Sequence, residues 1–323
     1  MIDVLIHSPF PRQTGQGNWV TADRTESILS NSGFEVEAEG GSYDGKGAKC
    51  LVALNARRSA GVVEAFDQAH PGRQVIVVVT GSDINHAEMA DKDSATRRTM
   101  ARADVLVTLH DADLEELPPE LQRKAVCIFP SVKLPEGMEH QPAARDRFEV
   151  IMAGNLRAVK NPQLAVEGAR LLANDSNVFI SSYGEAPADI VDAMNQASKE
   201  LGHFEWCGQL NHETLLRTMA RADLLLNTST LEGGANAICE AVSMGLPVVA
   251  SDIRGNVGML GRHYPGLFPS GDARTMADML RRCAEDVCFY GDLKRGVQQR
   301  AALFDFATES SAWTDLVRAR LEC

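Results

Sequence analysis

The sequence has no hydrophobic run long enough to cross a membrane and no excess of positive charge. Its longest aliphatic run is Val75–Val79, far short of the roughly 20 apolar residues that a membrane-spanning helix needs. Lys and Arg together number 32 and Asp and Glu 44, a net charge of −12. That balance argues against nucleic acid and anionic membranes as partners. Because Ile2–Ile6 follows Met1 without the basic and apolar regions of a secretory signal, we expect a cytoplasmic protein.

Cysteines and histidines with metal-ligand or disulfide spacing are also missing. The seven cysteines are scattered and odd in number, and none of their spacings is that of a zinc or thioredoxin site. The eight histidines include no pair at the spacing of ligands on one helix face. We therefore expect reduced thiols, no metal and no bound cofactor.

The chain instead contains short apolar segments that alternate with amphipathic ones. This pattern predicts an α/β fold of two Rossmann-like, doubly wound domains, each a parallel sheet with helices on both faces. The predicted strands lie near 2–8, 34–38, 50–54, 74–80, 104–109, 125–129, 148–153, 177–182, 203–206, 223–228 and 247–251. The predicted helices lie near 18–32, 57–69, 94–103, 111–117, 161–173, 187–201, 211–222, 234–244, 273–284 and 306–321.

One internal similarity supports two related halves. The segment 100–108, MARADVLVT, reappears as 219–227, MARADLLLN, although junctions between helices and strands draw on few residue types. Pro130–Arg147, with three prolines and a glycine, is typical of a linker. We therefore expect an N-terminal domain over 1–146, a second domain over 147–305 and a last helix, within 306–323, that crosses back to the first domain.

The stretch Thr228–Ser251 carries the strongest functional pattern. A strand runs into a loop with Glu232, Gly233 and Gly234 open a helix, and Glu240 follows about two turns later. Glycines at a helix start let phosphates approach backbone N–H groups, where the helix dipole favours anions. The pattern suits a nucleotide sugar, with one carboxylate near the sugar and the other on ribose hydroxyls. The alternative is an ordinary turn with two solvated glutamates.

Two further loops of the second half follow predicted strands, where open α/β sheets bind ligands. In Gly154–Pro162, Arg157 and Lys160 can neutralise a diphosphate leaving group, or both can be solvated cations. In Cys207–Leu210, Gly208 and Leu210 can offer backbone groups to a nucleobase edge.

Three loops of the first half are candidates for an acceptor site. Gly15, Gly17 and Asn18 follow the first strand, and they form either a phosphate or acceptor loop or a plain turn. Arg57, Arg58 and Ser59 open a helix, where guanidinium groups, a hydroxyl and free N–H groups can bind an anion; helix capping with surface ion pairs is the alternative. Thr80 and Asp83 fit a hydroxyl-binding loop or a turn equally well.

Together these loops resemble the retaining GT-B glycosyltransferases of family 4, whose two domains face a cleft. Gly154, Lys160, Glu232 and Glu240 stand at the places of that family's donor motif. The resemblance implies that Lys160 binds the diphosphate, Glu240 the ribose, and Glu232 lies beside the transferred sugar. Asn155 stands where the family commonly has Arg, and Arg157 lies two positions further on. Either of the two completes the diphosphate clamp.

The resemblance and the loops together give a donor site. The predicted catalytic residues of this site are Glu232, Lys160 and Arg157. The full donor-binding set is Asn155, Arg157, Lys160, Gly208, Leu210, Glu232, Gly233, Gly234, Ala235, Asn236 and Glu240.

A narrower resemblance covers nearly the whole chain. The segments 54–60, 80–83, 232–236, 254–261 and 264–268 and the end around Trp313 are similar to the selenosugar synthases of selenoneine biosynthesis. It implies transfer of a hexose, glucose or N-acetylglucosamine, from a UDP-sugar to selenophosphate, with a C–Se bond formed and UDP released. The alternatives are a family 4 enzyme for another small acceptor, such as a thiol or hydroxy acid, a UDP-sugar epimerase of the same architecture, and a relative that only binds.

Overall fold

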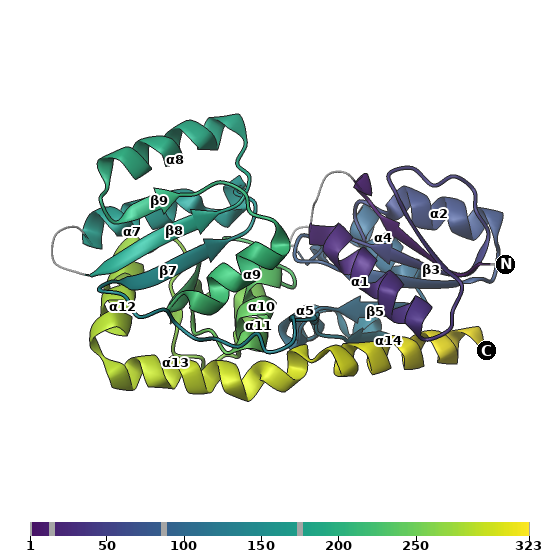
Figure 1. The fold of residues 1–323 in the computed structure, drawn as a ribbon. Coiled ribbons are helices and arrows are strands. Elements are labelled where there is room, and N and C mark those ends of the chain that lie inside the picture. The colour runs from purple at the N-terminus through teal and green to yellow at the C-terminus, as the bar shows by residue number, and fades with distance from the viewer. Residues whose placement is uncertain (1, 13–16, 85–88, 173–176, 323) are drawn as a thin grey trace. The chain divides into compact units, whose positions relative to one another are not determined.

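The structure is a computed structural model that describes residues 2–12, 17–84, 89–172 and 177–322. The chain forms two compact units. Unit 1 comprises the chain up to Pro130 and again from Phe306 onward, and unit 2 comprises Ser131–Asp305. Each unit is built around one sheet with helices on both faces (Figure 1).

Unit 1 contains a six-stranded parallel sheet in the order β2-β1-β3-β4-β5-β6. Its strands are β1 Ile2–Ser8, β2 Val36–Gly40, β3 Ala48–Leu54, β4 Gln74–Val79, β5 Val105–Thr108 and β6 Ala125–Cys127. Its helices are α1 Gly17–Asn31, α2 Ala60–Ala69, α4 Ala95–Arg102, α5 Asp111–Glu116, α6 Pro119–Gln122 and α14 Phe306–Leu321.

Side chains that alternate along the strands of unit 1 form one core on each face of the sheet. Val52 packs in the core that contains Trp19 of α1 and Trp313 of α14. Its neighbour Leu51 packs on the opposite face, in the core that contains Phe66 of α2. Because successive side chains of a strand point to opposite faces, an apolar run makes both cores at once.

Helix α14 completes the first of these cores from the far end of the chain. Trp313 is buried in it, and the carboxylate of Glu309 accepts two hydrogen bonds from Arg24 of α1, at 2.9 and 3.0 Å. Ser32 and Thr314 share a further hydrogen bond of 2.8 Å. The last helix is therefore a structural part of unit 1.

Unit 2 contains a second six-stranded parallel sheet, in the order β12-β11-β10-β7-β8-β9. Its strands are β7 Phe148–Ala153, β8 Val178–Tyr183, β9 Phe204–Trp206, β10 Leu224–Asn227, β11 Val248–Ser251 and β12 Leu267–Phe268. Its helices are η2 Ala158–Lys160, α7 Pro162–Leu172, α8 Ala188–Glu200, α9 His212–Arg221, α10 Asn236–Met244, α11 Arg254–Leu260, α12 Ala273–Glu285, α13 Val287–Arg300 and η3 Ala301–Phe304. The predicted class, two parallel α/β sheets, is confirmed.

The repeated segment has the same structural role in both units. Its aspartates, Asp104 and Asp223, each precede a strand in the middle of a sheet. The Asp104 carboxylate accepts the N–H of Val75 at 2.8 Å, and the Asp223 carboxylate accepts that of Glu149 at 2.7 Å. Each aspartate therefore satisfies the backbone of the neighbouring strand at its start.

The boundary between the two units lies earlier in the chain than we predicted from the sequence. We expected a linker at 130–147 and a boundary at 146, but the structure ends unit 1 at Pro130. The segment that follows packs on unit 2, where His140 N donates to Met244 O and Gln141 N to Ala220 O, both at 2.8 Å. Prolines prevent regular secondary structure there, but they leave the other N–H groups free to bond to unit 2.

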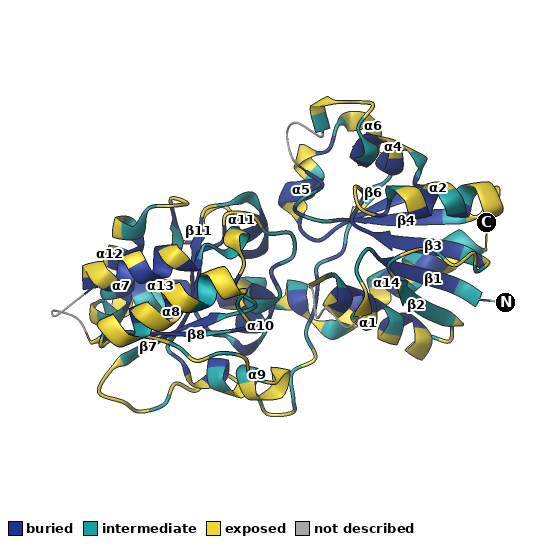
Figure 2. Ribbon diagram, turned by 90° about the horizontal axis from the view of Figure 1, so that it is seen from above, coloured by how far each residue is buried: buried dark blue, intermediate teal, exposed yellow. Residues whose placement is uncertain are grey.

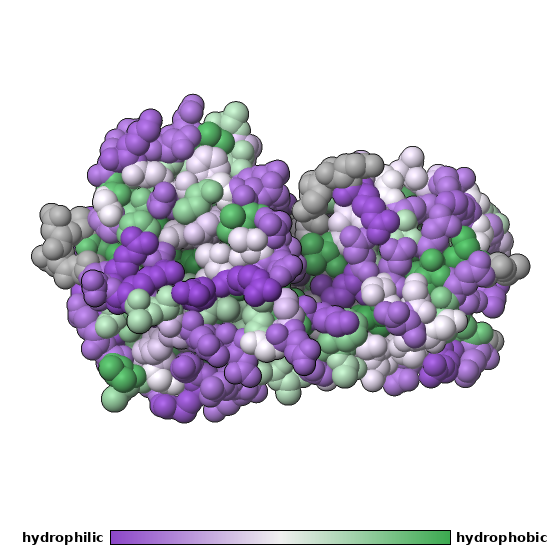
Figure 3. Space-filling view, in the orientation of Figure 1, coloured by the Kyte–Doolittle hydropathy of each residue, from purple (hydrophilic) through white to green (hydrophobic). Residues whose placement is uncertain are grey.

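Burial separates the strands from the outer sides of the helices. The strands of both sheets are largely buried, whereas helices such as α8 expose one side (Figure 2). On the face shown in Figure 3, hydrophilic side chains predominate and hydrophobic ones form scattered patches. No helix in the described part of the chain is both long and apolar enough to cross a membrane.

Candidate functional site

Three glycines lie at the carboxyl ends of neighbouring strands in unit 2. Gly154 follows β7, Gly184 follows β8 and Gly208 comes shortly after β9, and their φ angles are +129°, +144° and +71°. Gly184 N donates to Gly208 O at 2.8 Å, and a Cβ on Gly184 would lie 2.1 Å from Gly154 O. Only glycine allows this approach. The three loops therefore close on one another at the sheet edge where open α/β folds bind ligands.

The loop after β7 carries Asn155, which is hydrogen-bonded to the next loop, and Arg157, which is exposed. Asn155 Oδ1 accepts the N–H of Glu185 at 3.2 Å, which ties this loop to the one after β8. Arg157 is exposed, and within the described residues its guanidinium has no hydrogen bond and no ion pair. Of Asn155 and Arg157, the two candidates for the diphosphate clamp, Arg157 is the one whose side chain makes no hydrogen bond within the described residues. Its role remains a prediction.

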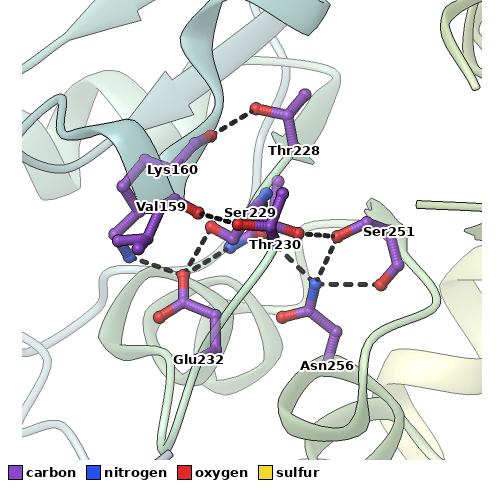
Figure 4. A network of polar contacts seen from close by, with 9 residues as sticks. Val159, Lys160, Thr228, Ser229, Thr230, Glu232, Ser251 and Asn256 are labelled. Atoms are coloured by element: carbon purple, nitrogen blue, oxygen red, sulfur yellow. Dashed lines mark hydrogen bonds and ion pairs between the residues drawn. The ribbon is translucent and has the colours of Figure 1, made fainter. Parts of the chain in front are cut away.

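The sequence-predicted pair Lys160 and Glu232 meets in the structure (Figure 4). Lys160 Nζ lies 2.5 Å from Glu232 Oε1. The backbone supports the pair, because Thr228 Oγ1 donates to Lys160 O at 2.8 Å and Thr230 N donates to Val159 O at 2.8 Å. The loops after β7 and β10 are thus joined beside one cation and one carboxylate.

The start of α10, where we predicted an anion to bind, has no side-chain cap. The helix begins at Asn236, two residues later than the predicted 234, after Ala235, which makes no capping hydrogen bond. Gly233 and Gly234 precede it as partly exposed residues. The N–H of Ile238 already donates to Ala235 O at 3.0 Å. The N–H groups of the two residues before it have no side-chain cap, and the helix dipole favours a negative group there.

Glu240 is bonded to a residue that the sequence reasoning missed. Its carboxylate lies 2.8 Å from Nε2 of His212, the first residue of α9. Hydrogen bonding to Glu240 raises the pKa of His212, and partial burial opposes this. The signal that could have found His212 is its place after the Gly208 loop, at the same carboxyl edge; Leu210 of that loop is half-buried.

A small pocket joins the ends of β7 and β10. The lining residues come from the two strands and the loops that follow them: Met152, Ala153, Gly154, Leu156, Lys160, Leu226, Asn227, Thr228 and Ser229. Lys160 is the charged group of this pocket. The structure therefore brings Gly154 and Lys160, predicted from one loop, to the loop that precedes Glu232.

In unit 1, hydrogen bonds join the loop after β3 to the loop after β4. Asn55 has a φ of +67°, and its Nδ2 donates to Thr80 Oγ1 at 2.7 Å. Its Oδ1 accepts the N–H of Arg58 at 2.9 Å. Asp83 accepts the N–H groups of Ala56 and Arg57 at 3.0 and 3.1 Å. The N–H groups that we expected to bind an anion are thus already occupied.

Asp83 and Ser59 are hydrogen-bonded inside the fold, whereas we predicted that both would bind the acceptor directly. Asp83 is fully buried and also accepts the N–H and hydroxyl of Thr80, at 2.8 and 3.1 Å. Burial raises the pKa of Asp83, and these hydrogen bonds lower it in part. Ser59 is also buried, and its hydroxyl donates to Leu54 O at 2.7 Å. For Thr80 and Asp83 these contacts favour the turn alternative; Ser59 makes no side-chain hydrogen bond that caps α2, so its contacts do not match the helix-capping alternative.

Two exposed arginines remain from the predicted acceptor set. Arg58 lies over the ring of Phe10, 4.9 Å from its centroid, while Arg57 has no side-chain partner within the described residues. Gly17 and Asn18 form the start of α1, and Gly15 lies outside the described residues. Across the described ranges of both units, no three His, Cys, Asp or Glu side chains gather as metal ligands.

Comparison with known proteins agrees with this layout. Residues 147–286 match the family described as glycosyl transferases group 1. The amylovoran biosynthesis glycosyltransferase AmsK of Erwinia amylovora is 29% identical over 160 residues, 45% of this chain and 37% of AmsK. The D-inositol 3-phosphate glycosyltransferase of Arthrobacter sp. (strain FB24) is 25% identical over 230 residues, 67% of this chain and 54% of that enzyme. The chain thus spans about half the length of these relatives, or less.

Solved structures match over almost the whole chain. The Anabaena protein Alr3699/HepE, in complex with UDP-glucose, covers 99% of this chain and 100% of its own at a TM-score of 0.75 and 15% identity. Sucrose-phosphate synthase from Thermosynechococcus elongatus covers 99% of both chains at a TM-score of 0.79 and 15% identity. The chain has the GT-B glycosyltransferase fold.

Within this GT-B chain, the family match covers the candidate donor residues and leaves unit 1 outside. Lys160, Glu232 and Glu240 all lie in the matched range, as does His212. Arg57 and Arg58 lie outside it. The prediction of an acceptor site at Arg57 and Arg58 is therefore not supported by the family match, and it stays a prediction.

Proposed function

We propose that the protein is a UDP-sugar-dependent glycosyltransferase and, more narrowly, a selenosugar synthase that transfers a hexose to selenophosphate. The observation that carries the broader proposal is the arrangement at one sheet edge of Lys160, Glu232 and Glu240 beside the uncapped start of α10. The group 1 family match over 147–286 and the GT-B fold agree with it.

The proposed orientation of the donor on unit 2 follows from these residues. The diphosphate lies at the start of α10 and takes the ammonium of Lys160 and the guanidinium of Arg157. The ribose hydroxyls donate to Glu240, and the hexose lies beside Glu232. Alr3699/HepE, with the same fold, has been solved with UDP and with UDP-glucose, which supports a uridine donor.

The reaction breaks the bond between the anomeric carbon and the diphosphate oxygen. That electron pair leaves on UDP, and the selenium of selenophosphate supplies the pair that forms the C–Se bond. The direct product is a hexosyl selenophosphate with its Se–P bond intact; attack of water on its phosphorus breaks that bond and gives the selenosugar and inorganic phosphate. Negative charge grows on the departing diphosphate, so the cations Lys160 and Arg157 bind the transition state more strongly than the ground state.

The acceptor assignment rests on Arg57 and Arg58 and on the similarity to selenosugar synthases. Both side chains are exposed, and Arg57 has no partner within the described residues. Guanidinium groups bind phosphate oxygens through two parallel hydrogen bonds. They can hold a phosphate-type anion and leave its selenium free.

The test is UDP release from UDP-glucose and from UDP-N-acetylglucosamine, with and without selenophosphate, followed by mass spectrometry of the products. Selenophosphate-dependent UDP release with a selenosugar of the expected mass supports the proposal. Release with a thiol or hydroxy acid alone supports the broader activity with another acceptor. Conversion of the UDP-sugar without acceptor indicates an epimerase, and binding of UDP without turnover overturns catalysis.

A further inference from the structure

One oxygen of the Glu232 carboxylate is fixed by three donors. Lys160 Nζ lies at 2.5 Å, Ser229 Oγ at 2.7 Å and Asn227 Nδ2 at 3.3 Å, and all three bond to Oε1. Within the described residues no hydrogen bond reaches Oε2. The carboxylate is therefore held from one side, and Oε2 is the oxygen left to a ligand.

The direction of the Asn227 amide is set by the two groups that donate to its oxygen. Ser229 N donates to Asn227 Oδ1 at 3.1 Å, and Asn256 Nδ2 donates to the same atom at 3.2 Å. A flipped amide would place its NH₂ group against two donors. Asn227 must therefore direct its NH₂ group toward Glu232.

Asn256 is oriented in the same way. Its side chain is fully buried in α11, and Nδ2 donates to Ser251 O at 3.0 Å and to Ser251 Oγ at 3.1 Å. The Ser251 hydroxyl uses its hydrogen on Ser229 O at 2.5 Å, so toward Asn256 it can only accept. Figure 4 shows this chain of contacts from Ser251 and Asn256 toward Glu232.

The backbone places α11 against the same loop. A Cβ on Gly255 would lie 2.4 Å from the carbonyl oxygen of Glu232, so glycine is required for this approach. Asn256 is the next residue. The helix that carries Asn256 is thus in direct contact with the chain that carries Glu232.

We propose that Asn227 is a positioning residue for Glu232, held by Asn256, and that the pair presents Oε2 to the transferred sugar. This inference rests on the proposed function only for the last step. The orientation of the two amides follows from which atoms donate and which accept. Asn227 touches the carboxylate and Asn256 acts through Asn227.

Two variants of one residue separate positioning from loop support. Asn227→Asp keeps the oxygen that accepts from Ser229 and Asn256, but it replaces the NH₂ group with a second acceptor facing Glu232. Asn227→Ala removes both functions. If Asn227 only supports its loop, Asp is tolerated and Ala is not. If it positions Glu232, Asp lowers kcat at least as much as Ala.

The expected effect is a fall in kcat of about 10–100-fold for both variants at saturating UDP-glucose and selenophosphate, the size of a lost hydrogen bond to a charged group. For Asn227→Ala, the Kd of UDP measured by calorimetry should stay within about threefold, because this substitution removes a hydrogen bond to Glu232 and none to the nucleotide. Thr230→Val is the matched control in the same loop, because it removes only a side-chain hydroxyl and keeps the backbone N–H that donates to Val159 O. Thr230 bonds only to Val159 among the described residues, and its variant should keep kcat within about twofold.

A measurement without turnover tests the orientation itself. In ¹⁵N spectra of the whole protein, Glu232→Ala should shift the side-chain NH₂ signals of Asn227 and speed their exchange with water by about tenfold or more. The signals of Asn256 should change less, since its acceptors remain. Unchanged Asn227 signals, or a normal kcat in Asn227→Asp, overturn the inference. A wild-type protein that releases no UDP overturns the proposed function instead, and the spectra still decide the positioning.

Discussion

The imidazole of His212 lies 2.8 Å from the carboxylate of Glu240, across the gap between the first residue of α9 and the second turn of α10. Glu240 is largely buried, whereas 61% of the His212 side chain is exposed. The carboxylate that we propose binds the ribose is thus hydrogen-bonded to a neighbour whose charge depends on pH.

We expect His212→Gln to lose stability at low pH only. Glu240 raises the pKa of His212 above its ordinary 6.5, so the pair's contribution is fully present below that value and disappears as pH rises through the raised pKa. Because His212 is exposed, the contribution is only about 0.2–1 kcal/mol. Urea unfolding of both proteins at about pH 5.5 and about pH 9 measures it. An equal difference at both pH values would contradict a charge effect.

Glu240→Ala should weaken binding of UDP by about 1.5–3 kcal/mol, the usual worth of hydrogen bonds to a charged group. Calorimetry with UDP measures the change. Glu213→Ala is the control, because Glu213 is an exposed carboxylate of α9 that pairs with Arg217. Unchanged affinity in Glu240→Ala, or an equal loss in Glu213→Ala, would remove Glu240 from the ribose site.

Lys160→Ala should lower kcat by about 10²–10³ and raise the donor KM less, since the cation acts on charge that develops in the transition state. Steady-state UDP release at varied UDP-sugar separates the two parameters. Lys199→Ala, at an exposed position near the end of α8, should behave as wild type. A near-normal kcat in Lys160→Ala would show that the ion pair with Glu232 is structural.

Asp83→Ala should lower stability by about 2–4 kcal/mol, because the N–H groups of Ala56, Arg57 and Thr80 lose their acceptor and buried unpaired donors are costly. Thermal unfolding measures the loss. Asp83→Asn keeps one accepting oxygen and should lose less. If Asp83→Ala has a normal melting temperature but a lowered kcat, Asp83 belongs to a hydroxyl-binding loop and is not only a support of the turn.

Replacing Arg57 and Arg58 together with Ala should raise the acceptor KM at least about tenfold and leave UDP affinity nearly unchanged, since only the acceptor anion is proposed to meet these side chains. Arg57→Ala alone should raise the acceptor KM more than Arg58→Ala, because the Arg58 guanidinium already lies over the ring of Phe10. Inorganic phosphate should compete with selenophosphate. A normal acceptor KM in the double variant would place the acceptor elsewhere.

Periodic segments were predictable from the sequence because their pattern is local. Short apolar segments that alternate with amphipathic ones predicted eleven of the twelve strands that the described residues form in the two sheets. Glu232, by contrast, lies outside α10, which begins at Asn236, so helix geometry alone does not place it relative to Glu240. The pattern failed where it was weak. Helices α11 and α13 and the two-residue strand β12 were not foreseen, since glycines and charged residues interrupt their apolar faces.

The sequence by itself therefore determined the α/β class, the order of most elements and the loops that follow most strands. Only the tertiary structure decided which polar atoms meet. It paired Lys160 with Glu232, His212 with Glu240 and Asn256 with Asn227, and it occupied the carboxylate of Asp83 with backbone N–H groups. Such contacts join residues far apart in the chain, and some of the loops concerned have residues with positive φ angles, such as Asn55 in the loop that bonds to Asp83 and Gly154 in the loop that carries Lys160. Residue periodicity carries no information about them, because each buried donor finds its acceptor only after the sheets have assembled.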